Sequence, residues 1–168
     1  FSAKCRFRRQ RVEDLDARDG LFDAITSISV FEHIVDERPA LTALRRLLAP
    51  GGTALLTLPC AATGYDQYRD YDEYGLAAPD SEGRYFFQRF YDTASLRQRV
   101  LSVMGEPSRV VVYGEREPGF FGRNAEAKMR GLPYPFWREG YMMGRNFQVY
   151  PSIDVLPGEG VVALEFIN

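Results

Sequence analysis

The chain has 168 residues, of which 45% are hydrophobic and 26% are charged, a composition expected for one globular domain. Its formal net charge of −2 gives no electrostatic reason to expect a nucleic-acid partner. No apolar run is long enough to span a membrane and no signal peptide is visible, so we expect a cytoplasmic protein, although an upstream segment could still carry a targeting sequence.

Metal and disulfide chemistry is not expected from the residue types present. Cys5 and Cys60 stand far apart, and His33 is the one histidine. These residues provide no ligand set for a structural zinc ion and no disulfide framework.

The chain opens with a predicted strand over residues 4–9. Arginines alternate there with Cys5 and Phe7, which is typical of a strand with one solvated face, and a phosphate site is the alternative. The basic run consists of Arg6, Arg8, Arg9 and Arg11.

A strand, a helix and a second strand are predicted between residues 22 and 59. Residues 24–30 mix Ile and Val with Ser and Thr, which favours a short, largely buried strand. The helix that follows has Pro39 in its first turn, cationic side chains near its end and leucines at helical spacing. The cations are Arg45 and Arg46, and the leucines are Leu41, Leu44, Leu47 and Leu48.

Ala49-Pro50-Gly51-Gly52 cannot continue this helix, and residues 53–58 are again strand-like. The usual handedness rule makes the unit a right-handed parallel crossover. In open sheets of this type, ligands bind beyond the carboxyl ends of the strands. We therefore expect functional residues within residues 27–33 and 58–63.

Residues 64–91 form a Tyr-rich insertion in which tyrosines are interleaved with acidic residues. Regular elements are interrupted there by Gly64, Gly75, Pro79 and Gly83. We predict a long, partly ordered loop that acts as a substrate lid, with a solvated insertion as the alternative. Tyr65, Tyr68 and Tyr91 are the residues expected to contact the substrate.

The rest of the chain returns to regular elements. Asp92 is a predicted N-cap of a helix with Leu96 and Val100 on one face, and Gly105 begins its stop. A strand is predicted at residues 109–113, and an irregular insertion at about residues 119–150. Residues 161–167 close the chain as a strand after a turn at residues 157–160.

Three short motifs carry a resemblance to a known family. Phe22-Asp23-Ala24-Ile25 is similar to the start of the fourth strand of class I S-adenosylmethionine-dependent methyltransferases, Val30-Phe31-Glu32-His33 to the turn after it, and Leu47-Leu48-Ala49-Pro50-Gly51-Gly52 to the turn before the fifth strand. The resemblance implies an α/β fold with a Rossmann-like sheet, mostly parallel with a final antiparallel strand. It also implies S-adenosyl-L-methionine as the cofactor.

Two features of that family should precede Phe1 and are absent from this sequence. They are the glycine-rich cofactor loop and the acid that binds the ribose hydroxyls. We therefore interpret the chain as the carboxyl-terminal part of a longer methyltransferase whose amino-terminal strands are missing. A natural truncated protein is the alternative.

The same resemblance places Glu32 and His33 close to the methyl donor. The imidazole of His33 is suited to accept a proton from a hydroxyl or amine during methyl transfer. In the alternative interpretation, Glu32 and His33 hydrogen-bond the helix start and shape the pocket. Ser27, Ile28 and Ser29, at the end of the fourth strand, are expected to line the cofactor.

For the adenine, Asp14 is predicted to make a polar contact and Val12 an apolar or backbone contact. The alignment with the family is ambiguous at this point. One alignment places Arg11 where the family has an acid, and a shifted alignment offers Glu13 or Asp14. A simple solvated turn is the further alternative.

The predicted function is methyl transfer to oxygen or nitrogen of a small-molecule acceptor. A non-catalytic domain that binds a partner through the Tyr-rich insertion is the alternative, and a nicotinamide oxidoreductase is a weaker third hypothesis. The sequence identifies neither the acceptor nor the oligomeric state.

Overall fold

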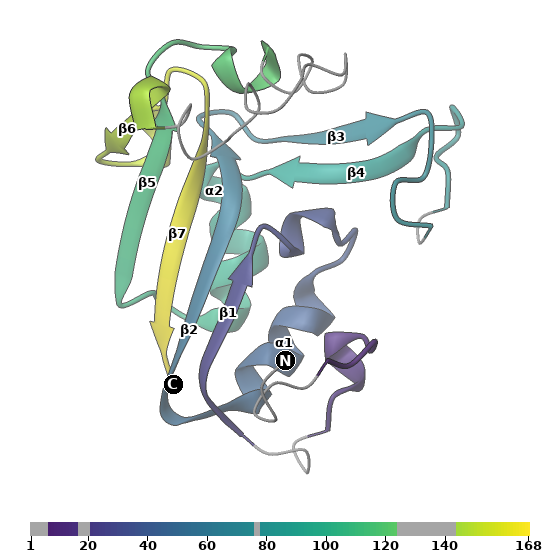
Figure 1. The fold of residues 1–168 in the computed structure, drawn as a ribbon, viewed down its shortest axis with the longest axis vertical. Helices are drawn as coiled ribbons and strands as arrows, with labels where there is room; N and C mark the ends of the chain where they lie inside the picture. Colours follow the sequence, from purple (N-terminus) through teal and green to yellow (C-terminus); the bar gives the residue numbers. More distant parts are fainter. Residues whose placement is uncertain (1–6, 17–20, 76–77, 124–143) are drawn as a thin grey trace.

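The computed structural model describes residues 7–16, 21–75, 78–123 and 144–168. Its main feature is a five-stranded sheet with the strand order β1-β2-β7-β5-β6, and β3 and β4 form a separate two-stranded sheet (Figure 1). The strands of the larger sheet are β1 (Phe22–Ile28), β2 (Leu48–Ala61), β7 (Glu159–Ile167), β5 (Arg109–Glu115) and β6 (Phe147–Tyr150).

The strand directions agree with the α/β sheet expected from the sequence. β1 and β2 are parallel, whereas β7 is antiparallel to both of its neighbours, β2 and β5. Consequently β1, β2 and β5 point the same way, and the strand predicted at residues 161–167 is the expected final antiparallel strand. β6 pairs antiparallel with the outer edge of β5 and was not predicted.

Helix α1 (Arg38–Leu47) connects β1 to β2, as predicted. Pro39 lies at its amino-terminal end, and two arginines lie in its last turn, where they complement the helix dipole. Leu41, Leu44 and Leu47 are buried, so the helical spacing of the leucines marks the face that packs against the sheet.

The predicted turn at Pro50-Gly51-Gly52 is an irregular start of β2. The pairing of β2 with β1 shifts its register here, so that β2 bulges before Thr53. Gly51 has a φ of 72°, which glycine adopts without steric cost. Asn168 closes the bulge, because its backbone pairs with both glycines and its side-chain amide donates to the carbonyl of Leu48.

Asp92 caps the second long helical segment, as predicted. Its Oδ1 accepts a hydrogen bond of 2.7 Å from the backbone N–H of Ser95, and the Ser95 hydroxyl completes a capping box. The helix continues through α2 (Thr93–Leu96), the π-helical η4 (Arg97–Leu101) and α3 (Ser102–Met104). Gly105, with a φ of 88°, ends it.

Helix α1 and the α2–α3 helix pack on the same side of the sheet (Figure 1). Successive side chains of a strand point to opposite faces, so alternate residues of β2 and β7 enter this core. The buried set includes Ala54, Leu56, Leu58, Val162 and Leu164.

β1 is an edge strand of the sheet within the described residues, and most of its residues are exposed. The prediction of a largely buried strand is therefore wrong for this structure. Ile25 packs against the core, but Ile28 is 59% exposed, because β1 lies at the margin of the described sheet.

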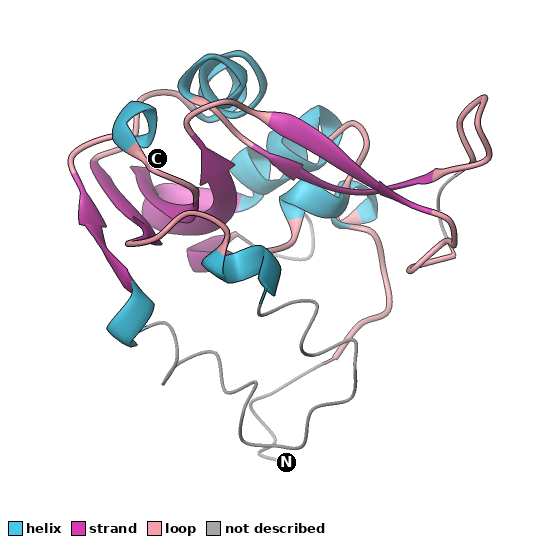
Figure 2. Cartoon of the chain, turned by 90° about the horizontal axis from the view of Figure 1, so that it is seen from above, coloured by secondary structure: helices cyan, strands magenta, loops and turns pink. Residues whose placement is uncertain are grey.

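Residues 64–91 contain an ordered hairpin, which corrects the predicted loop. β3 (Tyr65–Arg69) pairs antiparallel with β4 (Tyr85–Phe90). Tyr65 stacks on Phe90 across the pair, with ring centroids 4.6 Å apart, and such aromatic pairs stabilise antiparallel strands. Figure 2 shows this hairpin, here called the β3–β4 arm, extending away from the larger sheet.

The remaining expectations concern the ends of the described segments. Of the strand predicted at residues 4–9, only residues 7–9 are described, and they lie outside any strand, although their arginines are exposed as expected. Residues 124–143 of the predicted irregular insertion lie outside the described residues.

Short 3₁₀ turns occur at η1 (Val12–Asp14), η3 (Phe31–His33) and η5 (Ile153–Val155). In the described segments, no helix combines the length and apolar character needed to cross a membrane.

Candidate active site

The carboxyl ends of β1 and β2 border a cavity of about 310 Å³. The turn after β1 contributes Ser29, Glu32 and His33, and the start of β7 contributes Glu159. Aromatic residues from the region of the β3–β4 arm, including Phe87, line it as well. The cavity therefore lies where open α/β sheets bind their ligands.

Ser29 sets the direction of the turn that leads into the cavity. Its φ is 51°, a left-handed conformation that residues other than glycine seldom adopt. Its backbone N–H is held by Thr57 of β2, with the carbonyl oxygen at 3.2 Å and the side-chain hydroxyl at 3.1 Å. Backbone strain of this kind is concentrated at functional sites.

Glu32 is buried beside the cavity, with only 2% of its surface exposed. Its Oε2 atom has no hydrogen-bond partner among the described residues. Burial raises the pKa of Glu32 to about 7, and hydrogen bonds from its own backbone amide and from Ser29 offset this effect only in part. Glu32 therefore exchanges a proton near neutral pH.

The imidazole of His33 is oriented by the β3–β4 arm. Its Nδ1 lies 2.7 Å from the carbonyl oxygen of Phe87. A carbonyl can only accept, so Nδ1 carries a proton and, in the neutral ring, Nε2 keeps its lone pair. Nε2 lies 3.8 Å from Oε1 of Glu32 and 3.4 Å from the hydroxyl oxygen of Tyr74. The ring is thus arranged to accept a proton at Nε2.

Aromatic rings enclose this imidazole. The ring centroid of His33 lies 5.0 Å from that of Tyr74 and 5.3 Å from that of Phe87. The guanidinium carbon of Arg69 lies 3.4 Å from the centroid of the Phe87 ring, a cation–π contact. The arm therefore supplies an aromatic wall to this site, and Arg69 covers the Phe87 ring of that wall.

A buried ion cluster anchors the arm to the helices. Glu37, which has no exposed surface, accepts hydrogen bonds from Arg89 at 3.0 Å and from Arg99 at 2.7 Å. Arg89 of β4 also pairs with Asp66 of β3 at 2.9 Å. Burial acts to raise the pKa of Glu37, but the Arg99 hydrogen bond and the charges of both arginines outweigh it, so the pKa is lowered.

Tyr91 belongs to this ion cluster and not to the cavity. Its side chain is fully buried, and its hydroxyl donates to Oε1 of Glu37 at 3.0 Å. The predicted substrate contact by Tyr91 is therefore corrected, because the ring is enclosed in the core.

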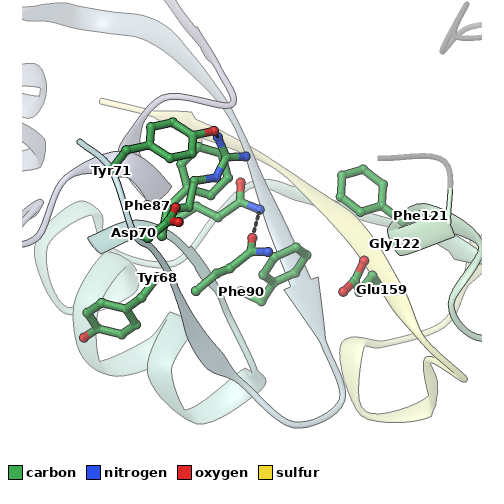
Figure 3. A pocket seen from close by; sticks show the side chains of 11 residues that line it. Tyr68, Asp70, Tyr71, Phe87, Phe90, Phe121, Gly122 and Glu159 are labelled. Carbon is green, nitrogen blue, oxygen red and sulfur yellow. Dashed lines mark hydrogen bonds between the residues drawn. The ribbon is translucent and has the colours of Figure 1, made fainter. Parts of the chain in front are cut away.

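A second cavity of about 560 Å³ adjoins the first, and Phe90, Phe121 and Glu159 line both (Figure 3). Tyr68 of the arm lines this second cavity. Tyr65 lines neither cavity, but its hydroxyl donates a hydrogen bond to Oε1 of Glu159, which lines both. The second carboxylate oxygen of Glu159, Oε2, is buried without a hydrogen-bond partner among the described residues. Burial raises the pKa of Glu159.

Glu115 holds the segment that carries Phe121 and the start of β7. Its buried carboxylate accepts backbone N–H groups from Gly119 at 2.9 Å, from Glu159 at 3.0 Å and from Phe121. Gly158 packs against the same carboxylate, and a Cβ there would overlap Oε2. Glu115 therefore positions two residues of the cavity through their backbone.

The other predicted cofactor residues line neither cavity. Ser27 and Ile28 precede Ser29 on β1 and line neither cavity. Val12 packs against the core and, with Asp14, forms η1 beside α1. The adenine contacts assigned to Val12 and Asp14 thus remain predictions.

The cavity residues that were not singled out from the sequence include Tyr74, Phe121 and Glu159. Tyr74 stands in the Tyr-rich insertion, whose composition did signal a functional segment. Phe121 and Glu159 come from distant parts of the chain, and no local pattern links them to the turn after β1.

Comparison with known proteins agrees with this geometry. A family profile described as a methyltransferase domain matches residues 2–100, which is more than half of the chain. The chain belongs to this family. The ubiquinone biosynthesis O-methyltransferases of Xanthomonas oryzae pv. oryzae and Xanthomonas campestris pv. campestris are each 42% identical to it over 57 residues, which are 33% of this chain and 24% of either protein.

A solved structure with a similar fold is the O-methyltransferase from the trans-AT PKS multienzyme of Brevibacillus brevis, in complex with S-adenosyl-L-homocysteine. The TM-score is 0.51 at 13% identity, and the match covers 95% of this chain and 47% of that chain. The likeness shows the fold alone. The chain thus matches about a quarter of the length of the curated relatives and about half of the length of the solved neighbour. The methyltransferase resemblance of the three sequence motifs is confirmed by the family match.

Proposed function

We propose that the cavity at the carboxyl ends of β1 and β2 is the reaction site of an S-adenosylmethionine-dependent methyltransferase that acts on oxygen or nitrogen of a small-molecule acceptor. The observation that carries this proposal is the orientation of His33, a residue of the cavity lining whose Nδ1 is held by the Phe87 carbonyl and whose Nε2 lies within 3.4 Å of the Tyr74 hydroxyl. Membership of the methyltransferase family supports it.

The residues of the cavity suit this cofactor. Its sulfonium is a cation, and Tyr74 and Phe87 offer aromatic rings whose faces attract cations. Ser29 lies at the end of β1, where the sheet meets the ligand. When bound, S-adenosylmethionine supplies an electrophilic methyl group.

His33 has the role of a general base in this proposal. With S-adenosylmethionine bound, the methyl–sulfur bond would break as the acceptor oxygen or nitrogen bonds to the methyl group, and S-adenosylhomocysteine would be left. Nε2 of His33 would take the proton of the acceptor. The carbonyl of Phe87 holds Nδ1–H and so keeps the ring in the required tautomer. The aromatic wall orients the acceptor and limits access of water.

We also infer that further strands pair with the outer edge of β1 in the complete domain. Two observations support this: β1 is exposed at the margin of the described sheet, and the solved neighbour is about twice as long as the match. An unpaired edge invites aggregation or pairing with another chain.

The experiment uses the intact natural protein that contains this chain. Calorimetry should detect binding of S-adenosylmethionine and S-adenosylhomocysteine, and the absence of heat and of a thermal shift with both ligands would refute the proposed function. If His33 is the base, both His33→Asn and His33→Ala should lower turnover by ~10²–10⁴ while cofactor affinity is kept. Near-normal turnover of His33→Asn would instead assign His33 a positioning role, because the Asn amide can still donate to the Phe87 carbonyl.

A further inference from the structure

The two unpartnered carboxylate oxygens are the feature that the proposed function leaves unexplained. Oε2 of Glu32 and Oε2 of Glu159 are the buried side-chain polar atoms, within the described residues, that lack a hydrogen-bond partner. Both residues line the same cavity. Leaving a buried polar atom unpaired is costly, so a ligand that donates to both oxygens would remove that cost.

The charged residues of the cavity wall determine which ligand charge is favoured. In the described part of the chain, Glu32 and Glu159 are the acidic residues of the lining, and no arginine or lysine lines the cavity. The nearby cation of Arg69 is already paired with Glu73, and that of Arg89 with Glu37 and Asp66. The cavity therefore favours a positively charged group.

Glu159 is held in a fixed position at the boundary of the two cavities. Its backbone N–H donates to Glu115 at 3.0 Å, and its Oε1 accepts the hydroxyl of Tyr65. These contacts use one carboxylate oxygen and leave Oε2 available. Figure 3 shows the carboxylate below the ring of Phe121 and to the right of that of Phe90.

The adjoining cavity suits the remainder of the ligand. It has a volume of about 560 Å³, and its lining includes the rings of Tyr68, Phe90 and Phe121 beside the charged side chains of Arg69 and Asp70. Flat aromatic or apolar groups bind well to such walls, and aromatic faces also attract cations.

Resting on the proposed function, we propose that the methyl acceptor is an arylalkylamine whose ammonium group binds between Glu32 and Glu159 and whose ring lies in the adjoining cavity. One ammonium proton passes to Nε2 of His33, and the nitrogen then has the lone pair that accepts the methyl group. Glu159 is then a specificity-determining residue for the acceptor.

The test is calorimetric titration of the intact natural protein, saturated with S-adenosylhomocysteine, with 2-phenylethylamine and with its uncharged analogue 2-phenylethanol. The amine should bind at least about tenfold more tightly, because only the amine carries the charge that the two carboxylates select. Glu159→Gln should abolish this preference and leave the affinity for 2-phenylethanol and S-adenosylhomocysteine unchanged. The matched control is Glu165→Gln, which alters a glutamate on the same strand outside both cavities and should keep the preference.

The wild-type comparison needs no variant, so a folding defect in Glu159→Gln cannot hide a negative result. Equal affinity for the two probes, or no binding of the amine, overturns the proposal. Loss of amine binding on saturation with S-adenosylhomocysteine also overturns it, because the carboxylates would then serve the cofactor. Selective amine binding in a protein that fails to bind S-adenosylhomocysteine would uphold the amine site and refute the proposed methyl transfer.

Discussion

The buried carboxyl of Glu32 should make the unliganded protein less stable as the pH rises, and Glu32→Gln should remove that dependence. Burial raises the pKa of Glu32 from 4.5 to about 7. The folded-state pKa of Glu32 lies above its unfolded value, so this carboxyl does not lower the free energy of unfolding below about pH 4.5. The loss of stability grows as the pH rises from there and is complete once the pH has passed about 7. One pKa unit corresponds to about 1.4 kcal/mol, so the full cost is about 3 kcal/mol.

The assay is urea unfolding of the unliganded protein at several pH values on both sides of this range, with the free energy of unfolding obtained by linear extrapolation. The free energy of unfolding of Glu32→Gln, relative to that of wild type, should rise by about 3 kcal/mol between acid and mildly alkaline pH. Glu82→Gln, which neutralises an exposed glutamate, serves as the control and should follow wild type. Parallel pH profiles for Glu32→Gln and wild type would refute the reasoning.

Three further changes test the contacts that hold the site. Glu37→Gln should lower the free energy of unfolding by about 3–5 kcal/mol in urea titrations, because two arginines lose a buried charged partner, whereas Arg84→Gln at an exposed pair should cost less than about 1 kcal/mol. The Glu37 contribution is present above the unfolded glutamate pKa and is lost as the pH falls through its lowered folded pKa, so equal losses for Glu37→Gln at pH 7 and at strongly acid pH would contradict it. Glu115→Gln should cost about 1–3 kcal/mol, since an amide in either orientation points a donor at a backbone N–H, and an unchanged unfolding curve would exclude the positioning role. Asp92→Ala should cost about 1 kcal/mol by thermal or urea unfolding and Asp92→Asn less, and equal losses would argue against the cap.

Features with short-range physical causes were predictable from the sequence. Pro39 and the spaced leucines predicted α1, Asp92 predicted the start of α2, and Gly105 predicted the end of α3. Caps, helix periodicity and glycine conformations act over a few residues, so they are visible in a local stretch of sequence.

The β3–β4 arm was missed because its stability is not local. Tyr65 pairs with Phe90 and Asp66 with Arg89 across a long connection, and glycines in that connection dominated the sequence pattern. The connection was correctly expected to be irregular, but the flanking segments gain order from cross-strand contacts and from the buried Glu37.

The same distinction applies to the site. The sequence by itself determined the turn that carries Ser29, Glu32 and His33, because that turn directly follows a strand and precedes a recognisable helix. Only the tertiary structure decided that Glu159 faces the same cavity. β7 inserts antiparallel between β2 and β5, and this pairing depends on burial across the whole sheet and not on any neighbouring residue.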